Sequence, residues 1–330
     1  MLRYIGKRLL MMIPVMLGVS LIVFCMVYFT PGDPAQYMLG ADASQETIQQ
    51  LREELGLNRP FWVQFFSYIK NIVLHGDLGT SYTTHRSVTV EILDRFPNTL
   101  RLAGLSIGLA TVVGITTGII AATKQYSIFD NLATVFALTG ISMPNFWTGL
   151  MLIIIFSLHL GWLPPSGFAE PKQWVLPVIT VGLASTATIM RQTRSSMLEV
   201  IRSDYITTAR AKGQTEGVIV FKHALRNALI PVITVIGIQF GTQLGGAIMT
   251  EAIYSIPGVG KLMVDAISMK NYPVVQGGVL FIALCFSLVN LAVDILYAFI
   301  DPRIRSQYSR KKKPSQHAHI PASKEGQNEA

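Results

Sequence analysis

The chain has 330 residues, of which 50% are hydrophobic and only 14% are charged. Ordinary soluble domains carry charge on roughly 25% of their residues, so this composition excludes a soluble fold and predicts that lipid surrounds much of the chain. The formal net charge of +8 does not indicate a nucleic-acid partner, because the basic residues cluster beside apolar runs and in the C-terminal tail. The chain is therefore expected to be an integral membrane protein.

Six apolar runs reach the length of about 20 residues that a helix needs to cross the bilayer. They occupy residues 9–29, 102–122, 132–158, 174–190, 229–250 and 274–300. The first run follows basic residues, as in a signal peptide, but it is longer and meets a Pro-Gly-Asp-Pro sequence where a small-residue cleavage site would stand. We therefore predict an all-α integral membrane protein with six transmembrane helices, the first of them retained.

The distribution of Lys and Arg predicts the orientation of these spans. Short basic loops remain in the cytoplasm, which places both termini and the loop at 191–226 on that side of the cell membrane. The sequence then divides into four segments: a basic start and first span at 1–30, an extracytoplasmic loop with short helices at 31–100, a core at 101–300 that contains the cytoplasmic loop 191–228, and a basic, disordered cytoplasmic tail near anionic lipid at 301–330.

The extracytoplasmic loop carries its own helix signals. Asp42 is expected to cap a helix that presents Ile48, Leu51 and Leu55 on one face and ends near Gly56. The aromatic stretch at 61–73 then suits a helix at the membrane interface. We expect this loop to be ordered.

The cytoplasmic loop contains a helix-turn-helix pattern. Asp204 is expected to cap a short helix over residues 205–212, and Gly213 would end it in the left-handed conformation. A second short helix is expected to open near Thr215. A partner that binds outside the membrane would explain such a structure, and the small side chains of Ala209 and Ala211 would allow it to approach closely. The alternative is an ordinary basic juxtamembrane loop without a partner.

The fifth span combines small and polar residues. Gly237, Gly241 and Gly245 recur at every fourth position, which predicts a face for close helix packing. Three polar residues lie beside this face and would either line a pathway or form hydrogen bonds across a subunit interface: Gln239, Thr242 and Gln243. In the sixth span, Asp294 is expected to be paired, near the interface or facing water.

The cytoplasmic loop resembles one known family. It has the form Y-x-x-T-A-R-A-K-G found in permease subunits of peptide-type ABC importers, and it places in that pattern Tyr205, Thr208, Ala209, Arg210, Ala211, Lys212 and Gly213. It departs from the general importer loop at Thr207, Thr208 and Arg226, as the peptide branch does. Further similar motifs lie at 31–34, 75–81, 142–147, 161–164, 255–260, 294–297 and 301–305, so that nearly the whole chain resembles the B-type permease.

The resemblance implies the type I importer permease fold (MetI-like) and a complex of five parts. In that complex the chain would pair with a homologous second permease, two ATP-binding subunits and an extracytoplasmic peptide-binding protein, and would move di- or oligopeptides inward. The seven loop residues would couple the permease to the ATPases, which bind ATP and Mg. By family resemblance, the same kind of complex could carry nickel, glutathione or haem.

The residues themselves predict no catalytic site, cofactor or metal in this chain. The glycines at 258–260 precede Lys261, but Ser255 and Leu262 break the nucleotide-binding P-loop pattern. The two cysteines, Cys25 and Cys285, form no metal-binding motif. A secondary peptide carrier would need ionisable groups along its pathway, and the six spans offer little beyond Asp294.

Overall fold

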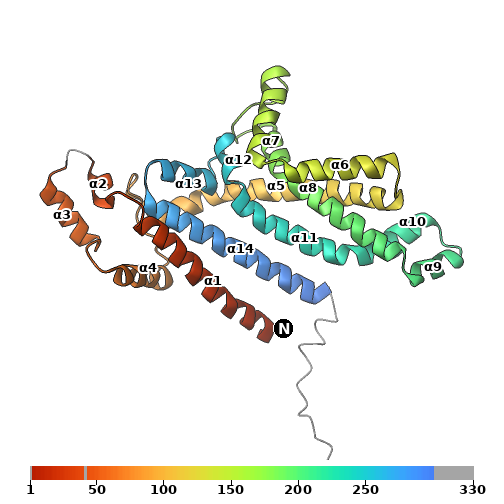
Figure 1. The fold of residues 1–330 in the computed structure, drawn as a ribbon, viewed down its shortest axis with the longest axis horizontal. Helices are drawn as coiled ribbons and strands as arrows, with labels where there is room; N and C mark the ends of the chain where they lie inside the picture. The colour runs from red at the N-terminus through yellow and green to blue at the C-terminus, as the bar shows by residue number, and fades with distance from the viewer. Residues whose placement is uncertain (1, 41–42, 301–330) are drawn as a thin grey trace, which may run out of the picture.

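The computed structural model describes residues 2–40 and 43–300, and within these ranges the fold is all-α (Figure 1). The elements before the core are α1 Leu2–Tyr28, α2 Pro34–Leu39, α3 Gln45–Glu54 and α4 Phe61–His75. The core contains α5 Val88–Thr123, α6 Ile128–Ser142, α7 Asn145–Leu152, the π-helix η1 Ile153–His159, α8 Pro171–Ile201, α9 Asp204–Ala211, α10 Glu216–Val218, the π-helix η2 Ile219–Ala224, α11 Leu225–Gly246, α12 Ile248–Ile253, α13 Val259–Ser268 and α14 Tyr272–Ile300. The predicted tail at 301–330 lies outside the described residues.

Five helices of the described chain are long and apolar enough to cross a membrane. They are α1, α5, α8, the run from α10 through η2 to α11, and α14. Five of the six predicted spans thus coincide with such helices, although the α5 helix begins at Val88, inside the predicted loop 31–100. The all-α membrane fold is confirmed.

The predicted third span is sharply bent and is not one continuous helix. The α6 helix ends at Ser142, and the pair formed by α6 and α7–η1 is bent by 107°. The cause is Pro144, because the residue before a proline avoids the helical region, and Met143 is extended with φ −82° and ψ 127°. In Figure 1, the segment formed by α7 and η1 leaves α6 at a steep angle, with α7 beside α12.

The extracytoplasmic loop predicted at 31–100 is ordered in its described part. Asp33 caps α2 by accepting a hydrogen bond from the Ala35 amide, and its carboxylate pairs with Arg52 of α3 at 2.7 Å. The cap of α3 is Ser44, which accepts from the Thr47 amide, so the predicted cap is wrong; Asp42 itself lies outside the described residues. A helix end near Gly56 was expected, and this glycine has φ +67°.

The α8 helix lies at the centre of the core and packs along α5, α6, α7 and α11. Its contact with α5 is close because two positions of α5 lack side chains. A Cβ at Gly118 would lie 2.8 Å from the Met190 carbonyl oxygen, and one at Gly114 would lie 2.9 Å from the Thr186 carbonyl oxygen. Close backbone approach of this kind is how helices associate inside a membrane, where surrounding lipid is as apolar as the side chains.

The glycines between α12 and α13 serve packing. The Glu251 carboxylate of α12 is fully buried and accepts hydrogen bonds from the amides of Gly260, at 2.7 Å, and Lys261, at 3.1 Å. A Cβ at Gly258 would collide with the same carboxylate. Burial raises the pKa of Glu251, whereas its hydrogen bonds to these amides oppose that shift. The turn therefore encloses a buried carboxylate at the N-terminus of α13.

The glycine face of α11 contacts α14 in the same chain. A Cβ at Gly237 would overlap Val293, one at Gly241 would lie 3.2 Å from Phe286, and one at Gly245 would lie 3.6 Å from Ile282. The two helices are therefore closest at Gly237 and further apart toward Gly245. The spacing in sequence predicts the face, and the structure adds its partner helix.

This gradient gives a first prediction. Gly237→Ala should lower the free energy of unfolding by about 1 to 3 kcal/mol, because the added methyl group overpacks the contact with Val293. Gly245→Ala is the matched control and should change stability little, since 3.6 Å is an ordinary contact. Thermal unfolding of the purified protein in detergent measures both. Equal melting temperatures for the two variants would contradict the packing described.

Candidate coupling site

The α9 helix and the turn that follows form the candidate site. The helix ends in a Schellman motif, in which the Gly213 amide donates to the Arg210 carbonyl and the Gln214 amide donates to the Ala209 carbonyl. Gly213 has φ +78°, and a Cβ added to it would meet no atom within 4 Å. The glycine is therefore required by backbone conformation and not by crowding.

The start of α9 differs from the prediction. Asp204 is the first helical residue, and Ser203 occupies the cap position. Neither forms the expected cap, since the Ser203 hydroxyl donates to the Val200 carbonyl at 2.6 Å. Asp204 remains favourable in the first turn, because its charge opposes the positive end of the helix dipole.

The inner face of α9 packs on its own chain. Ile206 and Ala209 are buried in an apolar group, here called the coupling cluster, that also contains Ala122 of α5, Met197 of α8, and Ile219, Ala224 and Ala228 of η2 and α11. Ala209 is only 9% exposed, so it packs on its own chain, and close approach of a partner at this residue remains a prediction. The cluster makes the loop a part of the core.

The outer face of α9 is exposed. Thr208, Ala211, Lys212 and Gly213 lie on it. Two further members of the predicted site also hold the turn in place. Arg210 forms an ion pair with Glu216 at 2.8 Å across the turn, and the Tyr205 hydroxyl accepts a hydrogen bond from the Asn227 amide of α11 at 2.7 Å.

The segment after Gly213 is one long helix and not a separate short one. Thr215 precedes α10, as expected, but the helix continues through η2 into α11 and reaches Gly246. Val218 and Phe221 lie outside the predicted site, yet they are 40% and 65% exposed on the helix that follows the turn. Apolar residues in a polar loop, one turn apart, were the signal that could have indicated them.

The polar residues of the fifth span bond within the chain. The side-chain amides of Gln239 and Gln243 both donate to the Ser185 hydroxyl of α8, at 3.1 and 2.9 Å, and the Thr242 hydroxyl donates to the Gln239 carbonyl. Asp294 is paired, as expected, with Arg8 of α1 at 3.2 Å. These contacts join α11 to α8 and α1 to α14 within the one chain.

Two parts of the chain match known protein families. Residues 114–306 match the family described as binding-protein-dependent transport system inner membrane component, and residues 1–103 match the N-terminal region of such membrane components. The chain belongs to this family. Its members are the membrane permeases of importers, so the chain is an integral inner-membrane permease component, and the family implies ATPase and substrate-binding partners.

Curated relatives cover almost the whole permease. It is 45% identical to the dipeptide transport system permease protein DppB of Alkalihalophilus pseudofirmus, over 92% of this chain and 100% of that protein. It is 46% identical to the glutathione transport system permease protein GsiC of Escherichia coli K12, over 92% of this chain and 99% of that protein.

Solved structures share the fold. Two crystal forms of the MetNI methionine ABC transporter, in inward-facing conformations, match with TM-scores of 0.52 and 0.54 at 19% sequence identity. The matches cover 64% of this chain and 97% and 96% of those chains. At this identity the likeness concerns the fold, which is the type I importer permease fold expected above.

The burial of Ala209 gives a second prediction. Ala209→Asp places an unpaired charge in the coupling cluster, at a cost on the order of several kcal/mol, and should loosen α9 from the core. Ala211→Asp is the matched control, because Ala211 is exposed on the same helix. Limited proteolysis of inside-out vesicles should cut the loop faster in the first variant only. Equal cleavage rates in both variants would argue against the buried position of Ala209.

Proposed function

We propose that this permease moves di- or oligopeptides into the cytoplasm as one half of a permease heterodimer. Two ATP-binding subunits would supply the energy, and an extracytoplasmic binding protein would deliver the peptide. The proposal is supported by one observation above all, the 45% identity over the full length of a dipeptide permease. The ATP and Mg would be bound by the partner subunits.

The exposed face of α9 is the proposed contact with an ATPase. Thr208, Ala211 and Lys212 would enter a groove on that subunit, with Val218 and Phe221 beside them as apolar contacts. Two observations support this contact. The outer face of α9 is exposed, and its inner face packs on α5 and α8. A movement of the ATPase would then move the core helices with the loop.

The proposed orientation places both termini and α9 in the cytoplasm. The ion pair between Arg8 and Asp294 joins the beginning of α1 to the end of α14, which supports a common side for the two ends. The basic loop that contains α9 follows the same rule for positive charge. The segment between α1 and α5 would then face the binding protein.

A second cargo is supported by a separate relative. The permease is 46% identical to a glutathione permease, and glutathione is itself a small peptide. Cargo choice in such systems is expected to depend on the separate binding protein. Glutathione import is therefore the second candidate function, and nickel or haem complexes follow it with less support.

Reconstitution tests the proposal directly. The complex of permease, partner permease, ATPases and binding protein would be placed in proteoliposomes with ATP, and uptake of labelled dipeptides, oligopeptides and glutathione would be compared. We expect ATP-dependent uptake of peptide. Uptake of glutathione alone would favour the second candidate, and ATP hydrolysis without uptake of any of the three would contradict the proposal.

A third prediction concerns Gly213. Gly213→Val should abolish most peptide uptake and most ATPase stimulation by the binding protein, because a β-branched residue at φ +78° is strained by more than about 1 kcal/mol and re-aims the turn. Gly217→Val is a matched control, since Gly217 has no positive φ and no atom lies within 4 Å of its added Cβ. Both variants should insert at normal levels. Wild-type uptake by the Gly213 variant would remove this turn from the coupling site.

A further inference from the structure

The α6 and α8 helices are joined by an ion pair whose carboxylate is buried. The Nε and Nη2 atoms of Arg194 donate to the two carboxylate oxygens of Asp130, at 2.6 and 2.8 Å, and the Tyr126 amide also donates to that carboxylate at 3.0 Å. The Asp130 side chain is 2% exposed, the least of any carboxylate in the ion pairs of the described chain. A bidentate pair of this kind fixes direction as well as distance.

The pair lies next to the coupling cluster. Arg194 is one turn before Met197, the α8 member of that cluster, and Asp130 is in the first turn of α6. The connection that precedes α6 begins where α5 ends, and Ala122 near that end belongs to the same cluster. Both partners of the pair are therefore adjacent in the chain to the elements that hold α9.

The other contacts of α6 are small and apolar. Ala133 and Ala137 pack against Ala187 and Met190 of α8, together with Ala121 of α5. Contacts of this type have no preferred direction along the helix, unlike the ion pair. A second polar contact near the connection, between Arg202 and Gln125 at 3.2 Å, is exposed.

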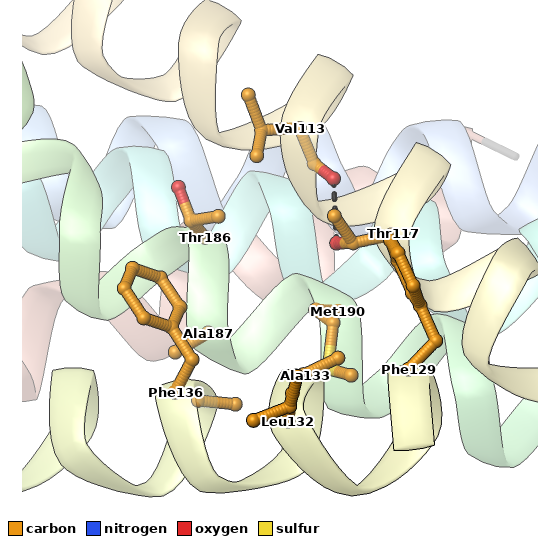
Figure 2. A pocket seen from close by; sticks show the side chains of 10 residues that line it. Val113, Thr117, Phe129, Leu132, Ala133, Phe136, Thr186, Ala187 and Met190 are labelled. Carbon is orange, nitrogen blue, oxygen red and sulfur yellow. Dashed lines mark hydrogen bonds between the residues drawn. The ribbon is translucent and has the colours of Figure 1, made fainter. Parts of the chain in front are cut away.

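A cavity of about 260 Å³ separates α6 from part of the core. Figure 2 shows side chains of three helices around it, including Phe129 and Phe136 from α6, Val113 and Thr117 from α5, and Thr186 from α8. The space leaves α6 room to shift against α5 and α8. The apolar contacts do not fix its position along α8, and the ion pair does.

The far end of α6 reaches the layer of α7 and α12. The helix has 15 residues, a length of about 22 Å, and the chain then turns at Pro144 directly into α7. There the Gly149 carbonyl accepts a hydrogen bond at 3.1 Å from the hydroxyl of Tyr254, the residue that follows α12. A shift of α6 at Asp130 therefore acts on α7 and α12.

We propose that Asp130 and Arg194 are positioning residues that make α6 follow the coupling segment, so that movement imposed at Gly213 reaches α7 and α12. The inference rests on the proposed function, because the movement is that imposed by an ATPase. Without the pair, α8 moves with α9 while α6 lags behind it. ATP hydrolysis then continues with less transport.

A transport measurement tests this with the reconstituted complex. In Asp130→Asn, Arg194→Gln and the double variant, stimulated ATP hydrolysis should persist while peptide uptake per ATP falls about tenfold, and the double variant should be no worse than either single one. The matched control is Lys261→Gln with Asp265→Asn, a more exposed ion pair within α13 at 3.0 Å. It should leave uptake per ATP unchanged.

A distance measurement tests the same inference without reference to cargo. Spin labels at Thr207 of α9 and Leu132 of α6, both exposed, would be placed in a background without the two native cysteines. Their separation should be the same with and without a non-hydrolysable ATP analogue in the wild type. In Asp130→Asn it should change with the nucleotide.

The outcomes separate the two proposals. An unchanged label separation in Asp130→Asn, or additive losses of uptake per ATP in the double variant, overturns the role of the pair. Failure of every variant to assemble, including the double variant that leaves no lone charge, also overturns it, since the pair would then serve folding alone. A wild-type complex that takes up no peptide, with the label result as expected, contradicts the proposed function only.

Discussion

The close approach of α5 and α8 is the contact on which the rest of the permease depends. Inside a bilayer, apolar surface gains nothing from leaving lipid for protein, so helices must attract one another through tight packing and internal hydrogen bonds. Gly114 and Gly118 bring the two backbones together, and the hydroxyls of Thr186 and Thr193 bond to carbonyls of their own helix. These two threonine hydroxyls are thus satisfied without water.

The coupling cluster extends this contact into the loop that contains α9. Ala122 and Met197 belong to α5 and α8, and they cover Ile206 and Ala209 of α9. The loop is therefore held by the same two helices that organise the membrane core. Its inner residues serve attachment, and its outer residues around Gly213 are left available to a partner.

Polar side chains within the spans join helices of the same chain. Gln239 and Gln243 bond to Ser185, Asp294 pairs with Arg8, and Asp130 pairs with Arg194. Buried pairs contribute little net stability against an apolar alternative, because desolvation offsets their attraction. Their physical advantage is direction, since each fixes how far one helix can slide along another.

The sequence by itself determined the membrane class, five of the spans, the glycine face of α11 and the left-handed turn at Gly213. These features follow from local properties: apolar length, residue spacing and the conformations that glycine alone adopts easily. Resemblance in the loop added the family, which the comparisons with known proteins bear out.

Only the tertiary structure decided which residues meet. The Ala209 side chain faces the core because it packs with Ile219 and Ala224, which follow it in the chain, and with Ala122, which lies far before it. Pro144 lies inside the predicted third span, and the apolar run continues past it without a sign of the bend, because hydropathy records length and not bend angle. The pairing of Asp130 with Arg194 spans 64 positions, and no local pattern specifies a contact that arises when two helices pack.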